Sequence, residues 1–234
     1  MNAPFALIVG VGDGLSASLA RRLHRDGYRL ALAARDTSKL DALAADVGAS
    51  VHGCDASDAD AVAALFDALG DDRLDVVVYN PSARTRGPVA ELDPVAVARA
   101  IDVTAFGAFL VAQRAARRML EQSPDDRGRR GTILFTGASA GVKGFPRSAP
   151  FAMGKFAQRG LAESMARELH PEGIHVCWIN IDGAIGNPGS EAPPDAPDSR
   201  LDPDAIADAY AALIDQHRST WSNELALRPW TESF

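Results

Sequence analysis

Short apolar runs alternate along this chain with longer stretches in which apolar residues recur at helical spacing. The runs predict strands at residues 5–9, 28–34, 50–54, 74–79, 132–136 and 174–181, with a short last strand at 224–227. The helical stretches are 15–23, 40–47, 58–69, 93–119, 151–169 and 203–216. This alternation is typical of a parallel sheet covered by helices on both faces. The predicted fold is a doubly wound α/β sheet, a single-domain Rossmann fold with three α/β/α layers.

A glycine-rich turn follows the first apolar run. It contains, in order, Gly10, Gly12, Gly14, Leu15 and Ser16. Glycine lets a phosphate approach the backbone closely, and the next helix presents free N–H groups to that phosphate. One register reads Gly-x-Gly-x-x-Ala from Gly12, and the other reads Gly-x-x-x-Gly-x-Ser from Gly10. Both registers predict that a nucleotide binds at this turn; the alternative is a strand-helix turn without a ligand.

One long connection lacks any periodicity. It is the stretch Asn187-Pro-Gly-Ser-Glu-Ala-Pro-Pro-Asp-Ala-Pro197, which follows the last long strand. Its proline and glycine content argues against regular structure, and its length exceeds that of an ordinary connection. Segments of this kind often close over a bound ligand, so we predict a lid at residues 186–202.

Composition narrows the classes of function. The 234 residues are 47% hydrophobic and 24% charged, which suits one domain over residues 1–234. A net charge of −7 argues against nucleic-acid binding. Cys54 and Cys177 lie in predicted strands and offer neither a disulfide framework nor metal-ligand spacing. We expect a cytoplasmic protein with a small-molecule substrate, no signal peptide in residues 1–4 and no membrane-spanning segment.

The order of several motifs resembles the short-chain dehydrogenase/reductase family over nearly the whole chain. These motifs are the glycine turn, Cys54-Asp55, Tyr79-Asn80-Pro81-Ser82, Gly131-Thr-Ile-Leu-Phe-Thr-Gly137, Phe151-Ala-Met-Gly-Lys155 and Asp182-Gly183. The resemblance implies a nicotinamide cofactor and a homodimer or homotetramer built on helices 93–120 and 151–169. The cofactor contacts it implies are Gly10, Gly12, Gly14, Leu15, Ser16, Arg35, Asp55, Asn80, Lys155, Gly183 and Ile185.

The departures from the family fall on its chemistry. Family members use a tyrosine for proton transfer, a serine to hold the substrate oxygen, a lysine on the nicotinamide ribose and an asparagine supporting a relay water. The resemblance retains the lysine as Lys155, but places Phe151, Ala138 and Thr104 at the other three positions. Ser139 follows Ala138, so a small shift of the loop would bring the Ser139 hydroxyl to the serine position of the family. The proton donor is therefore expected to be non-standard: Ser139, Ser148, a water held by Lys155, or the substrate.

Ser148 is a candidate because of a resemblance to the enoyl reductase branch of the same superfamily. That branch has Gly-x5-Ser in the first turn, which Gly10 to Ser16 match, and Tyr-x6-Lys in the second. The tyrosine position of the second motif is Ser148, so the branch is half matched. The Ser148 hydroxyl is a candidate substrate contact.

The choice of cofactor depends on the end of the second strand. Arg35 is placed to bind a 2′-phosphate, and Ala34 stands where an acidic residue would reject one. The acidic residues Asp36 and Asp13 argue against binding of a 2′-phosphate and so favour NAD(H). We therefore expect NADP(H) to be preferred, with NAD(H) possible. Asp55 is either an adenine contact or a helix cap.

Three hypotheses follow. The first is an NADP(H)-linked oxidoreductase acting on a small carbonyl, alcohol or enone with an unusual proton donor. The second is an inactive NADP(H)-binding sensor or partner subunit. The third is a non-redox isomerase or lyase on the same scaffold. The first is favoured because the cofactor side is more intact than the proton-transfer side, and hydride transfer is the chemistry of the cofactor.

Overall fold

The computed structural model describes residues 3–232. Its helices are α1 (Leu15–Arg25), α2 (Asp41–Val47), α3 (Ala59–Ala68), α4 (Pro94–Ile101), α5 (Gly107–Glu121), α6 (Ala149–Leu169) and α7 (Pro203–Asp215). Its strands are β1 (Phe5–Val9), β2 (Arg29–Ala34), β3 (Ser50–Gly53), β4 (Val76–Tyr79), β5 (Gly131–Thr136), β6 (Ile174–Ile181) and β7 (Glu224–Leu227). Short 3₁₀ turns lie at Val89–Glu91, Ser139–Gly141 and Arg218–Thr220.

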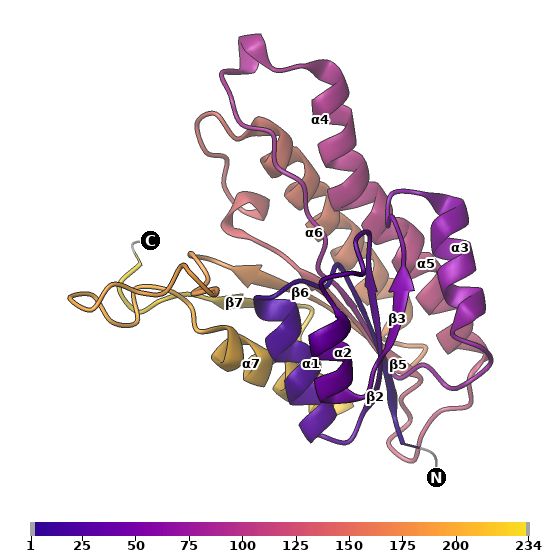
Figure 1. Cartoon of the computed structure of the whole chain (residues 1–234). Coiled ribbons are helices and arrows are strands. Elements are labelled where there is room, and N and C mark those ends of the chain that lie inside the picture. Colours follow the sequence, from indigo (N-terminus) through magenta and orange to yellow (C-terminus); the bar gives the residue numbers. More distant parts are fainter. Residues whose placement is uncertain (1–2, 233–234) are drawn as a thin grey trace.

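Within residues 3–232 the strands form one seven-stranded sheet in the order β3-β2-β1-β4-β5-β6-β7, and every pairing is parallel. The helices form a layer on each side of it (Figure 1). The chain runs outward from β1 to β3 and then returns to β4 on the other side of β1. This reversal makes a crevice between the carboxyl ends of β1 and β4, where ligands bind in such sheets. The predicted single-domain, three-layer Rossmann fold is confirmed.

Two apolar clusters, one on each face of the sheet, form the core. Alternate residues of β1 divide between them: Leu7 and Val9 face α3, α5 and α6, whereas Ala6 and Ile8 face α1, α2 and α7. Both faces of the central strands are buried, which explains why these strands appear in the sequence as unbroken apolar runs.

The helix predicted at 93–119 is continuous but irregular. Between α4 and α5 the residues Asp102–Phe106 form one turn of π-helix. The next residue, Gly107, lies so close to the sheet that a Cβ there would come 2.5 Å from the Tyr79 hydroxyl. That hydroxyl donates a hydrogen bond of 2.5 Å to the Val103 carbonyl. The π turn and the glycine together let this helix pass close to the end of β4.

By length and composition, the same helix, Pro94–Glu121, is able to cross a bilayer, with a mean hydropathy of 1.8 over its most apolar window. The sequence predicts no membrane-spanning segment, and among residues 3–232 this helix is the one candidate for such a segment. One such helix is weak evidence for a membrane protein, because core helices pass the same test. Here Val111, Ala115 and Met119 are fully buried against the sheet, as in a core helix.

Strand and helix ends differ from the expectation by one or two residues. One of the two-residue differences is at β4, which begins at Val76 and not at residue 74. The Gln122 side chain accepts a hydrogen bond from the Leu74 N–H and donates one to its carbonyl. Leu74 is thus fully buried, but its backbone bonds to a side chain and not to a neighbouring strand. Its apolar character alone does not distinguish these two cases.

Candidate functional site

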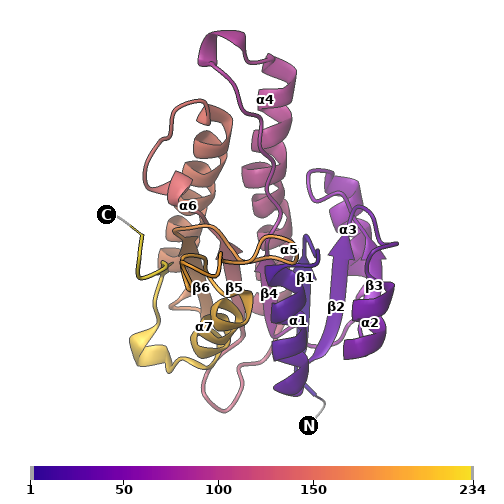
Figure 2. The ribbon, with the colours of Figure 1, turned by 60° about the vertical axis from the view of Figure 1, so that its left-hand side comes forward.

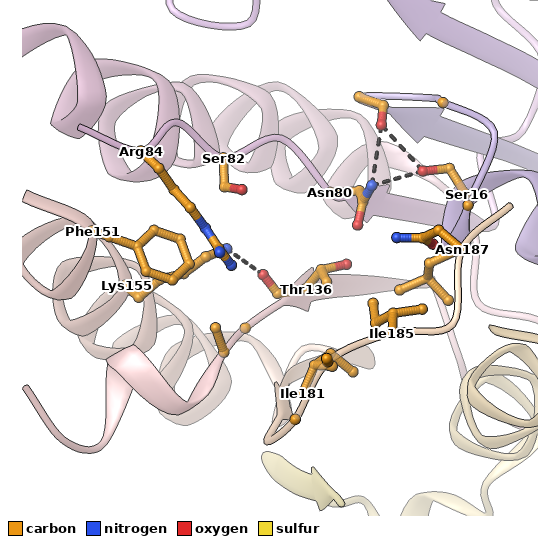
Figure 3. A pocket seen from close by; sticks show the side chains of 18 of the residues that line it. Ser16, Asn80, Ser82, Arg84, Thr136, Phe151, Lys155, Ile181, Ile185 and Asn187 are labelled. Carbon is orange, nitrogen blue, oxygen red and sulfur yellow. Dashed lines mark hydrogen bonds between the residues drawn. The ribbon is translucent and has the colours of Figure 1, made fainter. Parts of the chain in front are cut away.

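A cavity of about 650 Å³ opens at the carboxyl ends of the central strands, where the sheet order reverses. The glycine turn, the residues after β4 and β5, the start of α6 and the segment after β6 line it (Figure 3). Ser16, Asn80 and Asn187 lie at one end of the view, and Arg84, Phe151 and Lys155 lie at the other. The cavity therefore joins the predicted nucleotide turn to the predicted catalytic helix.

The glycine turn is fixed by side chains as well as by its own backbone. Gly10 has φ +81°, and a Cβ there would meet the Pro81 ring at 2.6 Å. The Asn80 amide donates to the Gly10 carbonyl at 3.1 Å and to the Ser16 hydroxyl at 2.7 Å, and that hydroxyl donates to the same carbonyl at 3.1 Å. The Asn80 and Ser16 side chains thus hold the turn in one shape, and the Asn80 N–H adds a bond to the Val9 carbonyl at 3.0 Å.

The start of α1 is open to the cavity. Its N-cap, Gly14, makes no side-chain capping bond, and the first turn of the helix contains no acidic residue. A Cβ on Gly12 would meet nothing within 4 Å, because this glycine faces open space. Free N–H groups at a helix N-terminus, reached past a residue without a side chain, can hold an anion.

A second cavity of about 690 Å³ adjoins the first and shares Gly10, Val11, Gly12, Asn80 and Ser82 with it. Its outer walls include Ala34, Arg35, Asp36, Lys39 and Asp55. Asp58, not Asp55, caps α3 by accepting from the Asp60 and Ala61 N–H groups. Asp55 accepts instead from the Ser57 backbone and hydroxyl, and these bonds lower its pKa, as does the nearby Arg35. The helix-cap interpretation of Asp55 is therefore wrong, and its carboxylate lies beside a cavity.

Lys155 is buried where β5 and α6 meet. Its ammonium group donates to the Thr136 carbonyl at 2.5 Å and to the Gln158 amide oxygen at 3.2 Å. Burial and, to a smaller extent, the nearby charge of Arg84 together lower the pKa of Lys155 to about 7. No carboxylate pairs with Lys155 within residues 3–232. A lysine pKa near 7 is the range that a general acid or base needs at neutral pH.

Gln158 connects Lys155 to the π turn. Its amide nitrogen donates to the Thr104 carbonyl at 3.2 Å, and its oxygen also accepts from the Trp178 indole at 3.3 Å. Thr104 itself is fully buried, and its hydroxyl accepts from the Ala83 N–H at 3.1 Å. The residue at the expected asparagine position is thus occupied on both its carbonyl and its hydroxyl by protein groups.

The hydroxyl groups predicted as proton donors lie away from Lys155. Ala138 and Phe151 line the main cavity, and neither carries a proton to transfer. Ser139 and Ser148 line a side cavity instead. Burial alone would raise the pKa of Asp182, but hydrogen bonds from Ser139 and Arg228 hold it below its usual value. The Ser139 hydroxyl is therefore engaged by a carboxylate that is itself ion-paired to Arg228.

The segment after β6 returns over the glycine turn. Gly183, Ile185 and Asn187 line the main cavity, and a Cβ on Gly14 would collide with the Asn187 amide. Figure 2 shows the segment, in orange, running from β6 toward α1. The Asn187 amide oxygen is buried and has no hydrogen-bond partner in the part of the chain that the structure describes. This unpartnered oxygen lies against Gly14, where it would come 2.0 Å from a Cβ.

Sequence reasoning missed three residues of the site: Arg84, Gln158 and Asn187. Gln158 follows Lys155 by three positions, so it lies on the same face of α6, a spacing that sequence analysis can detect. Arg84 and Asn187 lie in irregular segments, and they reach the cavity only through long-range folding. The Arg84 guanidinium lies 4.1 Å from the centre of the Phe151 ring.

The fold and this cavity define a Rossmann-type protein with a ligand site at the reversal of its sheet. The chain belongs to the short-chain dehydrogenase family: the family model described as short chain dehydrogenase matches residues 4–185. It is 32% identical to human 17-beta-hydroxysteroid dehydrogenase type 1 over 192 residues, which cover 76% of this chain and 56% of that protein. The match thus spans little more than half of that relative.

Two solved structures are similar over nearly their whole length. A short-chain dehydrogenase from Rhodopseudomonas palustris is 29% identical with a TM-score of 0.84, and the match covers 98% of this chain and all of that one. A metagenomic short-chain oxidoreductase in complex with NADP is 28% identical with a TM-score of 0.83, and the match covers 97% of each chain.

Proposed function

We propose that this protein is an NADP(H)-dependent oxidoreductase that acts on a small carbonyl, alcohol or enone. The observation that carries the proposal is Lys155, buried with a pKa of about 7 in a cavity that continues to an open glycine turn. Membership of the short-chain dehydrogenase family and the NADP complex of a 28% identical structure support it.

The residues of the two joined cavities fit an extended dinucleotide. Gly12 leaves open space beside the α1 N-terminus, where the pyrophosphate would lie. Arg35 and Lys39 line the outer cavity and would bind a 2′-phosphate, which favours NADP(H). Asp36 lines it too, which leaves NAD(H) possible. Lys155 would hold the nicotinamide ribose.

When bound, the nicotinamide supplies or accepts the hydride. The proton must come from elsewhere, because Phe151 and Ala138 take the places of the tyrosine and serine that family members use. Lys155 is placed to deliver it, directly or through a water in the cavity, because its pKa of about 7 matches such a role. Ser148 and Ser139 are the next candidates, and the substrate itself is the last.

Phe151 and Ala138, at the positions of the family's tyrosine and serine, also favour a second candidate function. Without the two hydroxyls the chain would be an NADP(H)-binding sensor or partner subunit, or would catalyse a non-redox isomerisation or elimination. Steady-state NADPH oxidation with a panel of ketones and enones separates these functions. Oxidation dependent on a substrate supports the oxidoreductase; tight cofactor binding without oxidation supports the alternative.

We also propose a homodimer or homotetramer built on α5 and α6. Phe106, Phe109, Met153 and Phe156 are large apolar side chains left exposed on these helices and on the π turn before α5. Closed symmetric assembly is the usual fate of such a face. Light scattering at micromolar concentration is expected to give a multiple of 24.7 kDa, the mass of one chain. A mass of one chain contradicts the proposal.

Cofactor binding is tested with Gly12→Val. The added Cβ meets no protein atom within 4 Å, and the side chain would fill the place of the pyrophosphate, so the change should abolish binding with little effect on the melting temperature. Gly160→Val is the matched control, because its Cβ also meets nothing and it lies on α6 outside the cavity. Titration of NADPH by fluorescence should show binding to the wild type and the control only. Unchanged binding by Gly12→Val would contradict the proposed site.

A further inference from the structure

The side cavity next to Phe151, of about 450 Å³, has a strongly biased charge. Arg84, Arg86 and Arg147 line it, together with Ser139 and Ser148, and no acidic residue does so among residues 3–232. This is unusual for a chain whose acidic residues outnumber its Lys and Arg residues by 31 to 24. The side cavity is therefore positively charged, although the net charge of the whole chain is −7.

In the part of the chain that the structure describes, these arginines have no ion-pair or hydrogen-bond partner for their guanidinium groups. Within residues 3–232 no carboxylate or carbonyl pairs with the guanidinium of Arg84, Arg86 or Arg147, although carboxylates pair with nine other arginines of the chain. Solvent reaches Arg84 through the cavity, yet burial lowers the pKa of its guanidinium, and the charge of Arg86 lowers it further. An anion in the cavity would relieve this unbalanced positive charge.

Arg84 lies at the junction of the two cavities. It lines the side cavity with Ser148 and also the main cavity with Lys155 (Figure 3). Its guanidinium lies over the Phe151 ring, 4.1 Å from the ring centre, so the aromatic face fixes its position without using its N–H groups. Those N–H groups remain available to a ligand beside Lys155.

The two loops that carry the arginines are joined. The Gly87 N–H donates to the Arg147 carbonyl at 3.1 Å, which ties the loop after β4 to the loop before α6. Arg147 adopts φ +62°, a conformation that a residue with a side chain rarely takes. This bond joins the two loops that bring Arg86 and Arg147 to the lining of the side cavity.

From this arrangement we propose that the substrate is a small oxo or hydroxy acid, whose carboxylate binds Arg84 with help from Arg86 and Arg147. A planar guanidinium with free N–H groups matches a carboxylate bidentately. The reacting carbonyl or alcohol lies within a few bonds of the carboxylate, because Arg84 and Lys155 line the same cavity. This inference rests on the proposed function and adds the class of its substrate.

The first test measures binding, without turnover. Malonate and succinate, their dimethyl esters and inorganic phosphate are titrated by calorimetry into the protein with and without NADP⁺. The free acids should bind at least about tenfold more tightly than their esters, as expected for a charge-assisted pair. Arg84→Gln should remove that difference and Arg84→Lys should restore part of it. Arg25→Gln, a change at an exposed arginine far along α1, is the control and should behave as the wild type.

The second test measures turnover. Small 2-oxo acids are compared with their methyl esters as substrates for NADPH oxidation, and Arg84→Gln should raise KM for the acid about tenfold or more, with little change for the ester. Equal use of acid and ester by the wild type, or binding of phosphate but not of carboxylates, overturns the inference and leaves the oxidoreductase proposal standing. Acid binding that depends on Arg84, without any NADPH oxidation, supports the anion site and contradicts the oxidoreductase proposal.

Discussion

The two ends of the main cavity are built in different ways. At the glycine turn, Asn80 and Ser16 form three hydrogen bonds that fix the backbone, and the ligand-facing groups are glycines and free N–H groups. At the α6 end, Phe151 and Ala138 have no polar side-chain group, and among residues 3–232 the Arg84 guanidinium makes no hydrogen bond and lies over the Phe151 ring. Backbone recognition needs a few glycines and one supporting amide, whereas proton transfer needs particular hydroxyls. One end can therefore keep its role while the other changes.

The largest change we predict comes from restoring the two hydroxyls. Phe151→Tyr combined with Ala138→Ser should raise NADPH-dependent ketone reduction roughly 10²- to 10⁴-fold, the usual contribution of a positioned acid. Lys155 is already in place, and tyrosine needs little more room than phenylalanine. Steady-state rates over a panel of ketones measure the change. If the wild type is already fast and the double variant gains nothing, the proton comes from elsewhere, and Ser139 and Ser148 are the next positions to change.

The second prediction concerns the charge on Lys155 in the ligand-free protein. Its folded pKa of about 7 lies below the ordinary value near 10.4, so between these values the unfolded chain binds more protons than the folded one. The free energy of unfolding should therefore rise with pH, by at most about 1.4 kcal/mol per unit. Urea unfolding at pH 7, 8 and 9 should show this rise in the wild type and a smaller one in Lys155→Met. Identical profiles would mean that Lys155 stays charged.

The third prediction addresses the outer cavity. Arg35→Asp should weaken NADPH binding about tenfold or more, because it removes a charged hydrogen-bond donor to the 2′-phosphate, and should leave NADH binding nearly unchanged. Fluorescence titration of both reduced cofactors measures the change. Equal wild-type affinities, or a preference for NADH that persists in the variant, would exclude Arg35 as the phosphate ligand.

The smallest effect is expected at the well-bonded end. Asn80→Ala removes two hydrogen bonds and should lower the free energy of unfolding by about 1–2 kcal/mol. Ser82→Ala is the matched control, because Ser82 lines the same cavity and its hydroxyl makes no hydrogen bond within residues 3–232. Chemical denaturation of both variants measures the difference. Equal stability of the two would show that the turn does not depend on Asn80.

The sequence predicted the elements well where burial decides them. Largely apolar runs marked β1 and β4 to β6, because both of their faces are covered. The π turn at Asp102–Phe106 was not predicted, because one extra residue in a turn leaves the apolar spacing of a long helix almost unchanged. The π turn is associated with a hydrogen bond from the Tyr79 hydroxyl to the Val103 carbonyl, two residues that are 24 positions apart in the sequence.

The site was predictable in part for the same reason. Gly10, Gly14 and Asn80 stand at the ends of buried strands, so their place at the sheet edge follows from the strand pattern. Arg84 and Asn187 lie in segments without periodicity, and nothing in their neighbours shows that they meet the same cavity. The lid at residues 186–202 remains a prediction, although its first residues already lie against the glycine turn.

The Gln158 amide determines how Lys155 exchanges protons with bulk water. An amide that accepts from Lys155 and donates to the Thr104 carbonyl does not readily pass a proton from one side to the other. The interior route is therefore closed, and exchange runs only through the cavity. Ligands that fill the cavity should trap the protonation state that Lys155 had when they bound. We expect kcat/KM to follow the titration of Lys155 while kcat stays nearly independent of pH, whereas Gln158→Glu should make both vary.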